Sequence, residues 1–523
     1  MDTDVLVVGA GPTGLMLANQ LARRGVRPLI IDRHASPSVQ TRALGVQART
    51  LEIYSHLGIA DRAIALGKRA GGANIWALGR PKARIPLGDI GRDLSPYPFL
   101  LILGQDDNER LLGDALRDHG LSVDWSTELV GLTQESAHVR ATLKGQDGVT
   151  REITAAWVAG CDGAHSAVRE LSGIAFQGAP YEQVFFVADT EVTGTMVPDE
   201  INVYLWRRGF HLFFPMRGTD HWRVVGILPP ALHHHDLTFD DVVPSIREQA
   251  GAALSFRQCT WFSTYHIHHR RAARFRDRRC FLLGDAAHIH SPVGAQGMDT
   301  GLQDAYNLAW KLALVVTGRA GASLLDSYQD ERIPVAQRVL DTTDRAFSLV
   351  VSDSRLVGLL RTRVLVKLVA FAMRFVLVQR LAFRTISQIG IHYRDTARLP
   401  ADANPPATGP QAGDRMPWLR LRFRPDDATE DLFELLDDTR FNLIVAGQPA
   451  PATDAPGLGD LLRIHVVPDQ SENNLALDRA GIPRPSFYLL RPDCHVGLAG
   501  TRLDSATIAG YLSQCIHLVP TGA

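Results

Sequence analysis

The sequence lacks the cysteine patterns of disulfide-rich domains and metal centres. Its five cysteines, at positions 161, 259, 280, 494 and 515, are odd in number and form neither a CxxC pair nor a zinc-finger spacing. Such cysteines are typical of reduced thiols, so we expect a cytoplasmic protein. The histidines at 233–235, 266, 268 and 269 have no accompanying carboxylate or cysteine pattern, which favours surface or hydrogen-bonding roles. We therefore predict no metal site.

The sequence also has no excess of positively or negatively charged residues. The 55 lysines and arginines nearly balance the 56 aspartates and glutamates, the net charge is -1, and no long basic block occurs. This balance argues against a nucleic-acid partner. With 45% hydrophobic and 21% charged residues, the 523-residue chain is predicted to be soluble and globular, with two or three domains.

Long uninterrupted apolar runs are absent as well. The most membrane-like segment, 356–382, is broken by five cations at 361, 363, 367, 374 and 380. We interpret it as an amphipathic bundle helix and predict no membrane partner. No basic-then-apolar leader precedes the first predicted strand, at residues 3–8, so we expect no secretory signal.

The N-terminal sequence contains a dinucleotide fingerprint in its proper context. The apolar run DVLVVG leads into Gly9-Ala10-Gly11-Pro12-Thr13-Gly14 and then into the helical sequence LMLANQLARRG. The three glycines allow a tight turn, close approach of a pyrophosphate, and packing of the helix on the strand. A second predicted strand ends at Asp32, eighteen residues after Gly14, where a carboxylate can bond a ribose hydroxyl. The sequence therefore predicts a Rossmann-type nucleotide site.

A second glycine-bearing turn lies in the stretch 281–314, which joins a buried strand to a long helix. Gly284 and Asp285 follow the strand, and Pro292, Gly294 and Gly297 let the backbone approach a ligand. The positive end of the helix favours an anionic or electron-rich group, with Asp299 or Thr300 as possible caps. An ordinary strand-loop-helix crossover is the alternative interpretation.

A third turn follows an apolar strand in the sequence WVAGCDGAHSAVR, residues 157–169. Asp162 either caps this turn or holds a cofactor, and local chemistry does not separate the two. Cys161 has no evident base partner, which favours a structural thiol. Arg42, in a polar loop, either covers a cofactor phosphate or flavin edge or is a surface arginine.

Two further regions complete the chain. Residues 175–276 alternate and are rich in aromatic side chains, which predicts an antiparallel sheet able to wall a flat apolar ligand with Tyr204, Trp206, Phe213 and Phe214 as candidates. A Pro-, Ala- and Gly-rich linker at 399–413 precedes an alternation of strands and helices. This last region contains no CxxC, so we expect a packing or assembly role.

Three cofactor-type turns in one chain favour a flavoprotein, and the sequence resembles the FAD-dependent aromatic hydroxylases of the para-hydroxybenzoate hydroxylase type. The resemblance is strongest to the phenol, polyketide and rifampicin hydroxylase branch, which has a thioredoxin-like C-terminal domain. It covers nearly the whole chain. Its most specific stretches are VVGAGPTGLMLANQLARRG, GCDGAHSAVR and LLGDAAHIHSPVGAQGMDTGLQDAYNLAWKLA, with weaker support from GDRMPW and YLLRPDCHVGLAG.

The resemblance implies an α/β fold with a discontinuous Rossmann-like FAD-binding domain, residues 1–175 and 279–345. An antiparallel β-sheet substrate domain is interleaved with it at 176–278, together with part of 71–100. A helical segment at 346–398 and the linker at 399–413 lead to a thioredoxin-like domain at 414–523 without CxxC. We expect a monomer or homodimer.

The resemblance also implies the residues that hold FAD. Gly9, Gly11 and Gly14 match the pyrophosphate site, Asp32 the adenosine ribose site and Asp285 the ribityl site. Asp162 belongs to a motif implicated in both FAD and NAD(P)H binding, and the amides near Gly297 and Met298 face the flavin N1 and O2 edge. The complete set of implied cofactor-binding residues is Gly9, Gly11, Pro12, Thr13, Gly14, Asp32, Arg33, Arg42, Gln105, Asp162, Asp285, Pro292, Gly297 and Met298.

The implied reaction is NAD(P)H-dependent hydroxylation of a phenolic or polycyclic aromatic compound by O2, through a flavin C4a-hydroperoxide, with either NADPH or NADH as co-substrate. The same flavin chemistry also performs epoxidation or Baeyer-Villiger oxidation, and a non-catalytic flavin-binding scaffold is the alternative from another class. No catalytic acid or base is identified. The pocket candidates are Tyr204, Trp206, His211 and Phe213, whose strands precede the Phe214-Pro215-Met216 turn.

Two residues depart from the family pattern. Asp299 stands where the family commonly has Asn, and a carboxylate close to a reduced flavin opposes its negative charge unless it turns away. Ala295 replaces a usual glycine, which we expect to stiffen the loop.

Overall fold

The computed structural model describes residues 1–38, 43–77, 79–206, 209–233, 237–251, 253–291, 295–351, 364, 366–397, 399, 404–424, 428–449 and 459–519. Arg42, Pro292 and Gly294 lie outside these ranges, as do the histidines at 234 and 235 and the arginines at 361 and 363. All structural statements below concern the described residues.

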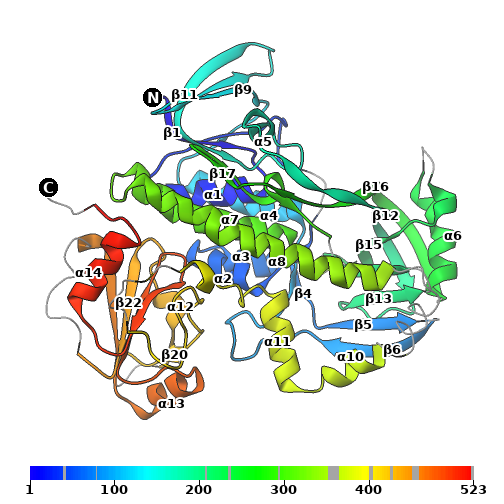
Figure 1. Ribbon diagram of the computed structural model, residues 1–523. Helices are drawn as coiled ribbons and strands as arrows, with labels where there is room; N and C mark the ends of the chain where they lie inside the picture. Colours follow the sequence, from blue (N-terminus) through cyan, green and yellow to red (C-terminus); the bar gives the residue numbers. More distant parts are fainter. Residues whose placement is uncertain are drawn as a thin grey trace.

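A mostly parallel sheet carries the N-terminal fingerprint. Its strand order is β17-β18-β11-β1-β2-β8, and the pairs around β1 are parallel. The strands are β17 (Arg276–Asp277), β18 (Cys280–Leu282), β11 (Thr150–Gly160), β1 (Thr3–Val8), β2 (Leu29–Ile31) and β8 (Val123–Asp124). Helices α1 (Pro12–Ala22), α4 (Gln105–Asp118) and α7 (Gly297–Val316) pack beside it (Figure 1). The Rossmann-like prediction is confirmed.

An eight-stranded sheet, in the order β19-β16-β12-β15-β14-β13-β5-β6, forms the second layer. All its neighbours are antiparallel except β13 and β5. The last two strands in this order, β5 (Gly72–Ala77) and β6 (Arg80–Pro86), come from the N-terminal third of the chain. The others are β12 (Phe176–Gly194), β13 (Ile201–Trp206), β14 (Gly209–Pro215), β15 (His221–Ile227), β16 (Leu254–Ala272) and β19 (His288–Ile289). The expected antiparallel sheet is therefore present.

Helices lie on both sides of this second sheet. Helix α6 (Phe239–Ala250) packs its apolar side chains on one face, where Phe239 contacts the rings of Phe256 and Phe262. The long helix α8 (Asp326–Val351) crosses the molecule to the opposite face, where Phe347 packs on Phe185 (Figure 1). Successive side chains of a strand point to opposite faces of the sheet, so alternate residues of each strand point to the side of α6 or the side of α8.

The C-terminal residues form a four-stranded sheet, in the order β23-β22-β24-β25, that packs against α7 (Figure 1). Trp310 and Leu314 of α7 share an apolar cluster with Phe441, Phe487 and other side chains of this sheet. The elements are β22 (Phe441–Ala446), β23 (Leu462–Val467), β24 (Ser486–Leu490), β25 (Val496–Gly500), α12 (Leu432–Leu435), α13 (Ser471–Arg479) and α14 (Ser505–Gln514).

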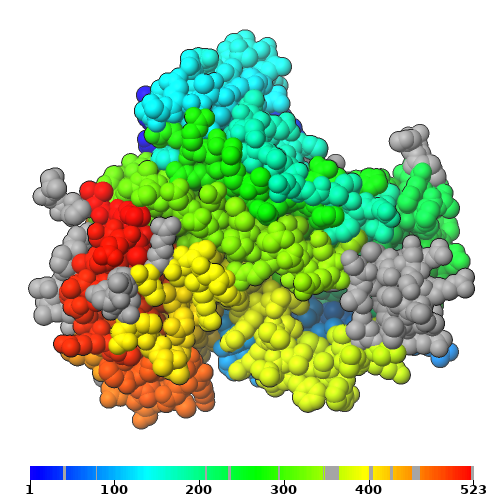
Figure 2. Space-filling model, viewed as in Figure 1, coloured from blue at the N-terminus to red at the C-terminus, as the bar shows by residue number. Residues whose placement is uncertain are grey.

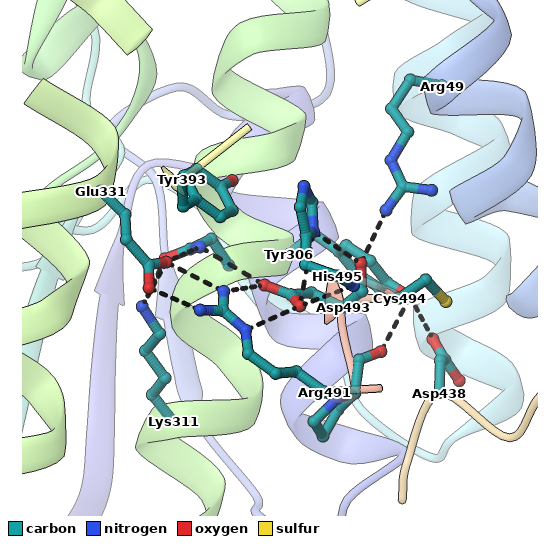
Figure 3. Close-up of polar contacts among 12 residues, drawn as sticks. Arg49, Tyr306, Lys311, Glu331, Tyr393, Asp438, Arg491, Asp493, Cys494 and His495 are labelled. Atoms are coloured by element: carbon teal, nitrogen blue, oxygen red, sulfur yellow. Dashed lines mark hydrogen bonds and ion pairs between the residues drawn. The ribbon is translucent and has the colours of Figure 1, made fainter. Parts of the chain in front are cut away.

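A buried ion network joins this C-terminal unit to α7 and α8 (Figure 3). Arg491, between β24 and β25, lies 2.6 Å from Glu331 of α8 and 2.5 Å from Asp493. Lys311 of α7 donates to Glu331 at 2.9 Å, and Arg49 donates to the Asp493 carbonyl at 2.7 Å. Burial raises the pKa of Glu331, but Arg491 and Lys311 outweigh it and bring that pKa to about 2. The network therefore fixes the C-terminal unit against α7, because breaking a buried ion pair has a large cost in free energy.

Two shorter helices, α10 (Val366–Ala372) and α11 (Val376–Ile386), follow α8 along the chain. Part of the segment 356–382 lies outside the described residues. The bundle interpretation is wrong for the part that is described, because several large apolar side chains of α10 and α11 are exposed rather than packed. No helix in the described ranges combines the length and apolarity needed to cross a bilayer.

Candidate active site

The three glycine-bearing turns lie side by side at one edge of the parallel sheet. They follow β1, β11 and β18, which are neighbours and run in the same direction, so their carboxyl ends meet. Gly9 has a φ of +102° and passes so close to the next turn that a Cβ would lie 2.4 Å from the Cys161 carbonyl oxygen. Only glycine fits there.

The turn at Gly284 contacts the fingerprint turn through Thr13. A Cβ on Gly284 or on Gly301 would lie 2.7 Å or 2.5 Å from the Thr13 hydroxyl. The side chain of Thr13 is therefore enclosed between the turn after β18 and the second turn of α7. The start of α1 and the start of α7 are held together by this contact.

Gly11 differs from the other two fingerprint glycines because it faces open space. A Cβ on Gly14 would lie 1.9 Å from the Gly9 carbonyl oxygen, whereas nothing lies within 4 Å of a Cβ on Gly11. Gly11 is also the N-cap of α1 and supplies no side-chain cap. The first amides of α1 and the space at Gly11 together form a cradle that suits an anionic group such as a pyrophosphate.

Asp32 lies at the end of β2 beside this cradle. Its Oδ2 accepts a hydrogen bond from the Ala10 amide at 2.7 Å, and its Oδ1 accepts one from the His34 amide at 2.8 Å. The carboxylate is thus oriented by the fingerprint turn itself. Arg33 is exposed next to it.

Two of the expected cofactor residues have structural partners. Asp162 accepts hydrogen bonds from the Ser166 hydroxyl at 2.6 Å and the Val168 amide at 3.2 Å, at the start of α5 (Ala167–Leu171). Ser166 is the N-cap of this helix, and its hydroxyl accepts from the Arg169 amide. Burial raises the pKa of Asp162. Gln105 begins α4, where its side chain accepts from the Ala43 amide at 3.2 Å and donates to Glu109 at 2.8 Å. The Gln105 side chain is thus fixed between the loop at Ala43 and its own helix.

Asp299, in the first turn of α7, turns away from its own helix end. Its Oδ1 accepts from the Gln47 amide at 2.9 Å and from the Thr50 hydroxyl at 2.5 Å, at the start of α2 (Ala48–His56). Its Oδ2 is buried without a hydrogen-bond partner among the described residues. Burial raises the pKa of Asp299 to about 7.

The expectation that Asp299 or Thr300 caps α7 is wrong. The N-cap is Gln296, which makes no side-chain cap, and Thr300 donates its hydroxyl to the Gln296 carbonyl at 2.8 Å. The amides at the start of α7 are therefore not capped by either side chain. The positive end of α7 lies beside His290, whose ring is 3.7 Å from a Cβ built on Gly297. The buried Nε2 of His290 has no hydrogen-bond partner among the described residues.

Ala295 adopts a left-handed conformation, with a φ of +50°. Such a conformation costs an alanine on the order of 1–2 kcal/mol relative to its ordinary backbone. Its Cβ also lies 2.7 Å from a Cβ built on Gly45. The replacement of glycine at this position is therefore strained and is tightly enclosed.

A buried polar network beneath the turn at Gly284 was not found from the sequence. Asp304 of α7 accepts from the Gly284 amide at 3.0 Å, lies 2.7 Å from His288 Nε2, and pairs with Arg332 of α8 at 2.6 Å. Burial is the largest single influence on its pKa and raises it, but Arg332, His288 and the hydrogen bonds from His288 and Gly284 together outweigh burial and lower that pKa. This network fixes the turn that presents Asp285, whose side chain is exposed.

The four pocket candidates on the second sheet do not lie on the same face as the residues that approach the glycine turns. Tyr204 and Phe213 share an apolar cluster with α6, and His211 lies 2.7 Å from Gln249 of α6, with Trp206 stacked on it. The alternate residues on the same strands include Val203 and Phe214, which pack with Leu44 and Leu100 on the side of the Gly45–Ala295 contact.

The chain is similar to known proteins over most of its length. The family described as "FAD binding domain" matches residues 2–343. The chain is 32% identical to 6-methylpretetramide 4-monooxygenase from Streptomyces rimosus, over 99% of this chain and 94% of that protein. It is 33% identical to pentachlorophenol 4-monooxygenase from Sphingobium chlorophenolicum, over 88% of this chain and 83% of that protein. The crystal structure of aklavinone-11 hydroxylase with FAD and aklavinone has a TM-score of 0.81 and 26% identity, covering 98% of this chain and 99% of that one.

Proposed function

The chain belongs to the FAD-binding domain family and is an FAD-dependent aromatic monooxygenase, and from this premise we propose that it hydroxylates a phenolic or polycyclic aromatic compound. NAD(P)H and O2 are the co-substrates. Bound FAD would supply two kinds of chemistry: acceptance of a hydride from NAD(P)H, and activation of O2 for transfer of one oxygen atom to an aromatic carbon with reduction of the other to water.

The observation that carries the proposal is the open cradle at Gly11, where the turns after β1, β11 and β18 converge. Gly9, Gly11, Pro12, Thr13 and Gly14 supply the turn and the amides for the pyrophosphate. We propose that Asp32 and Arg33 contact the adenosine ribose and that Gln105 and Asp285 also contact the cofactor. We extend the proposal to Arg42, Asp162 and Pro292 from the family resemblance.

The start of α7 is proposed to stabilise negative charge on the reduced cofactor. Gly297 and Met298 provide amides that neither Asp299 nor Thr300 caps, and a helix N-terminus favours an anion by about 0.3–1 kcal/mol. Asp299 is directed to Gln47 and Thr50, and its raised pKa leaves it partly neutral near pH 7. The carboxylate therefore opposes that charge less than its position in the sequence suggests.

The substrate is proposed to lie against the sheet face that includes Val203 and Phe214. This face continues into the apolar cluster with Leu44 and Leu100, beside the Gly45–Ala295 contact. A flat, water-excluding wall next to the cofactor suits aromatic oxygenation, because water in the site diverts reduced flavin and O2 to peroxide. The substrates that the relatives' names give, 6-methylpretetramide and pentachlorophenol, support a ring compound.

We propose the same division of the chain as the sequence predicted. It has an FAD domain at 1–175 and 279–345, and a substrate domain at 176–278 with part of 71–100. The remaining parts are a helical segment at 346–398, a linker at 399–413 and a thioredoxin-like unit at 414–523. The sheet memberships of β5, β6 and β22–β25 support it. A cytoplasmic monomer or homodimer remains the prediction.

The test is turnover of the purified yellow protein. It is incubated with NADPH or NADH and a panel of monocyclic phenols and polycyclic phenols, and nicotinamide oxidation is followed together with the mass of the products. The proposal expects at least one panel member to accelerate oxidation and to gain one oxygen atom. Uniformly slow oxidation with no oxygenated product contradicts it.

A further inference from the structure

Six large apolar side chains of α10, α11 and the turn between them form an exposed surface that we call the apolar patch: Leu368, Phe371, Phe375, Val376, Leu377 and Leu381. They are between 53% and 80% exposed. Phe371 and Phe375 stack edge to face at 5.4 Å, so two phenyl rings stand together in solvent. Figure 2 shows these helices in yellow-green on the surface at the lower edge of the molecule. Exposed apolar surface concentrated in this way marks an interaction site.

Positive charge is interspersed with the apolar patch. Lys367, Arg374, Arg380 and Arg384 are exposed on the same two helices and the turn between them, and no aspartate or glutamate occurs in the sequence between Ser354 and Arg394. Strand β6, which contacts α10, adds the exposed Arg80 and Lys82. Arg380 lies 3.9 Å from the carboxylate of the exposed Asp93. The surface is thus apolar and cationic.

The mixture of apolar and cationic side chains indicates which kind of partner binds this surface. Two copies of the chain meeting face to face through the patch would bring like charges together, which is unfavourable. An anionic lipid bilayer offers acyl chains to the phenyl and leucyl side chains and headgroup phosphates to the lysine and arginines. We propose that α10 and α11 dock this enzyme on the surface of an anionic membrane, without crossing it.

The docking surface is bonded directly to the start of α7. Gln296 donates its side-chain amide to the carbonyls of Thr385 and Ile386 at 2.9 Å and 3.1 Å. Gln388 donates to the Thr300 hydroxyl at 2.8 Å. Docking therefore holds the proposed active site close to the bilayer, where apolar ring compounds partition. This delivery role rests on the proposed substrate class, whereas the docking itself does not.

The test is co-sedimentation of the FAD-loaded protein with vesicles of phosphatidylcholine alone or with added phosphatidylglycerol. We expect sedimentation with the anionic vesicles, little with the neutral ones, and weakening as salt rises. Lys367→Gln with Arg374→Gln should weaken binding about fivefold per cation removed. Leu377→Gln with Leu381→Gln should weaken it at least about tenfold, since both leucines lose apolar contact.

The matched control is Leu475→Gln on α13, an exposed leucine away from the patch, which should bind vesicles as the unchanged protein does. FAD absorbance and thermal unfolding verify that each variant is folded. Protein that stays in the supernatant with both vesicle types overturns the proposal, as does binding that the patch variants leave unchanged. A dimer that the leucine variants dissociate, without vesicle binding, assigns the patch to a second copy instead. Turnover is measured separately, so failure of docking is distinguishable from failure of the proposed reaction.

Discussion

Asp299 of α7 accepts a 2.5 Å hydrogen bond from the hydroxyl of Thr50 of α2, and this bond links the start of the proposed flavin-facing helix to its neighbour. The carboxylate of Asp299 is fully buried, and its negative charge contributes to raising the pKa of the nearby Tyr54. A residue that departs from the family pattern is therefore built into the packing between two helices.

Asp299→Asn should retain FAD and remove a pH dependence of stability. The pKa of Asp299 is raised from 3.8 to about 7 by burial, so between these values the folded protein holds a proton that the unfolded chain has lost. Stability of the unchanged protein should then fall as pH rises through that window, by up to about 1.4 kcal/mol per pH unit. The melting temperatures of the two proteins, measured from pH 4 to 7, should diverge in favour of the variant.

Parallel pH profiles for the two proteins would show that Asp299 is not protonated in the fold. Complete loss of FAD from Asp299→Asn would show that the carboxylate itself is required for cofactor binding. Thr50→Val, which removes only the hydroxyl donor, serves as the comparison because it should keep the pH dependence.

Gly11 and Gly14 offer a matched pair for the cofactor cradle. A side chain at Gly11 enters open space, so Gly11→Val should fold yet lose FAD affinity by at least about tenfold, or ~1.4 kcal/mol. A Cβ at Gly14 meets the Gly9 carbonyl at 1.9 Å, so Gly14→Ala should disrupt the turn itself. Circular dichroism reports folding, and equilibrium dialysis reports FAD binding. Normal FAD affinity in Gly11→Val would place the cofactor elsewhere.

Phe214 and Phe213 test which face of the second sheet meets substrate. Phe214→Ala should raise KM for the aromatic substrate with FAD content unchanged, because Phe214 belongs to the face near the glycine turns. Phe213→Leu lies in the cluster with α6 and should lower stability by about 1 kcal/mol while KM stays constant. Steady-state kinetics and thermal unfolding of both variants supply the readouts. The reverse pattern would favour the original pocket candidates.

Glu331→Gln should loosen the C-terminal unit. The change leaves Lys311 and Arg491 buried with less negative charge, and breaking such a pair costs about 3–5 kcal/mol. The glutamate's lowered pKa means that its stabilisation is complete above about pH 4.5 and is lost as pH falls toward about 2. Urea unfolding should show an earlier transition in the variant. Glu472→Gln, an exposed glutamate paired with Arg422, is the control and should change stability by under about 1 kcal/mol.

The parts of the fold that the sequence predicts are those fixed by short-range pattern. The fingerprint from Gly9 to Gly14 specifies its own strand, turn and helix, and parallel pairing of the strands brings the other turns beside it. Asp162 illustrates the limit. Its two interpretations have the same local sequence, and the contacts with Ser166 and Val168 could not be predicted from that sequence.

The remaining features depend on contacts between distant residues. Asp304 and Arg332 are 28 positions apart in the sequence, and Glu331 and Arg491 are 160 positions apart. No local sequence pattern therefore predicts either ion pair. The pocket candidates illustrate a different difficulty. Both faces of β13 and β14 are apolar, and alternation alone does not tell which face a helix covers.

The most direct measurement of the central claim is incorporation of isotopic oxygen. The FAD-loaded protein is supplied with NAD(P)H, ¹⁸O₂ and an aromatic compound that accelerates nicotinamide oxidation, and the product is analysed by mass spectrometry. The account predicts a product that carries one ¹⁸O atom on its ring, with one NAD(P)H oxidised per product formed. Oxidation of NAD(P)H that yields only hydrogen peroxide with every such compound, or a product whose new oxygen comes from water, would contradict it.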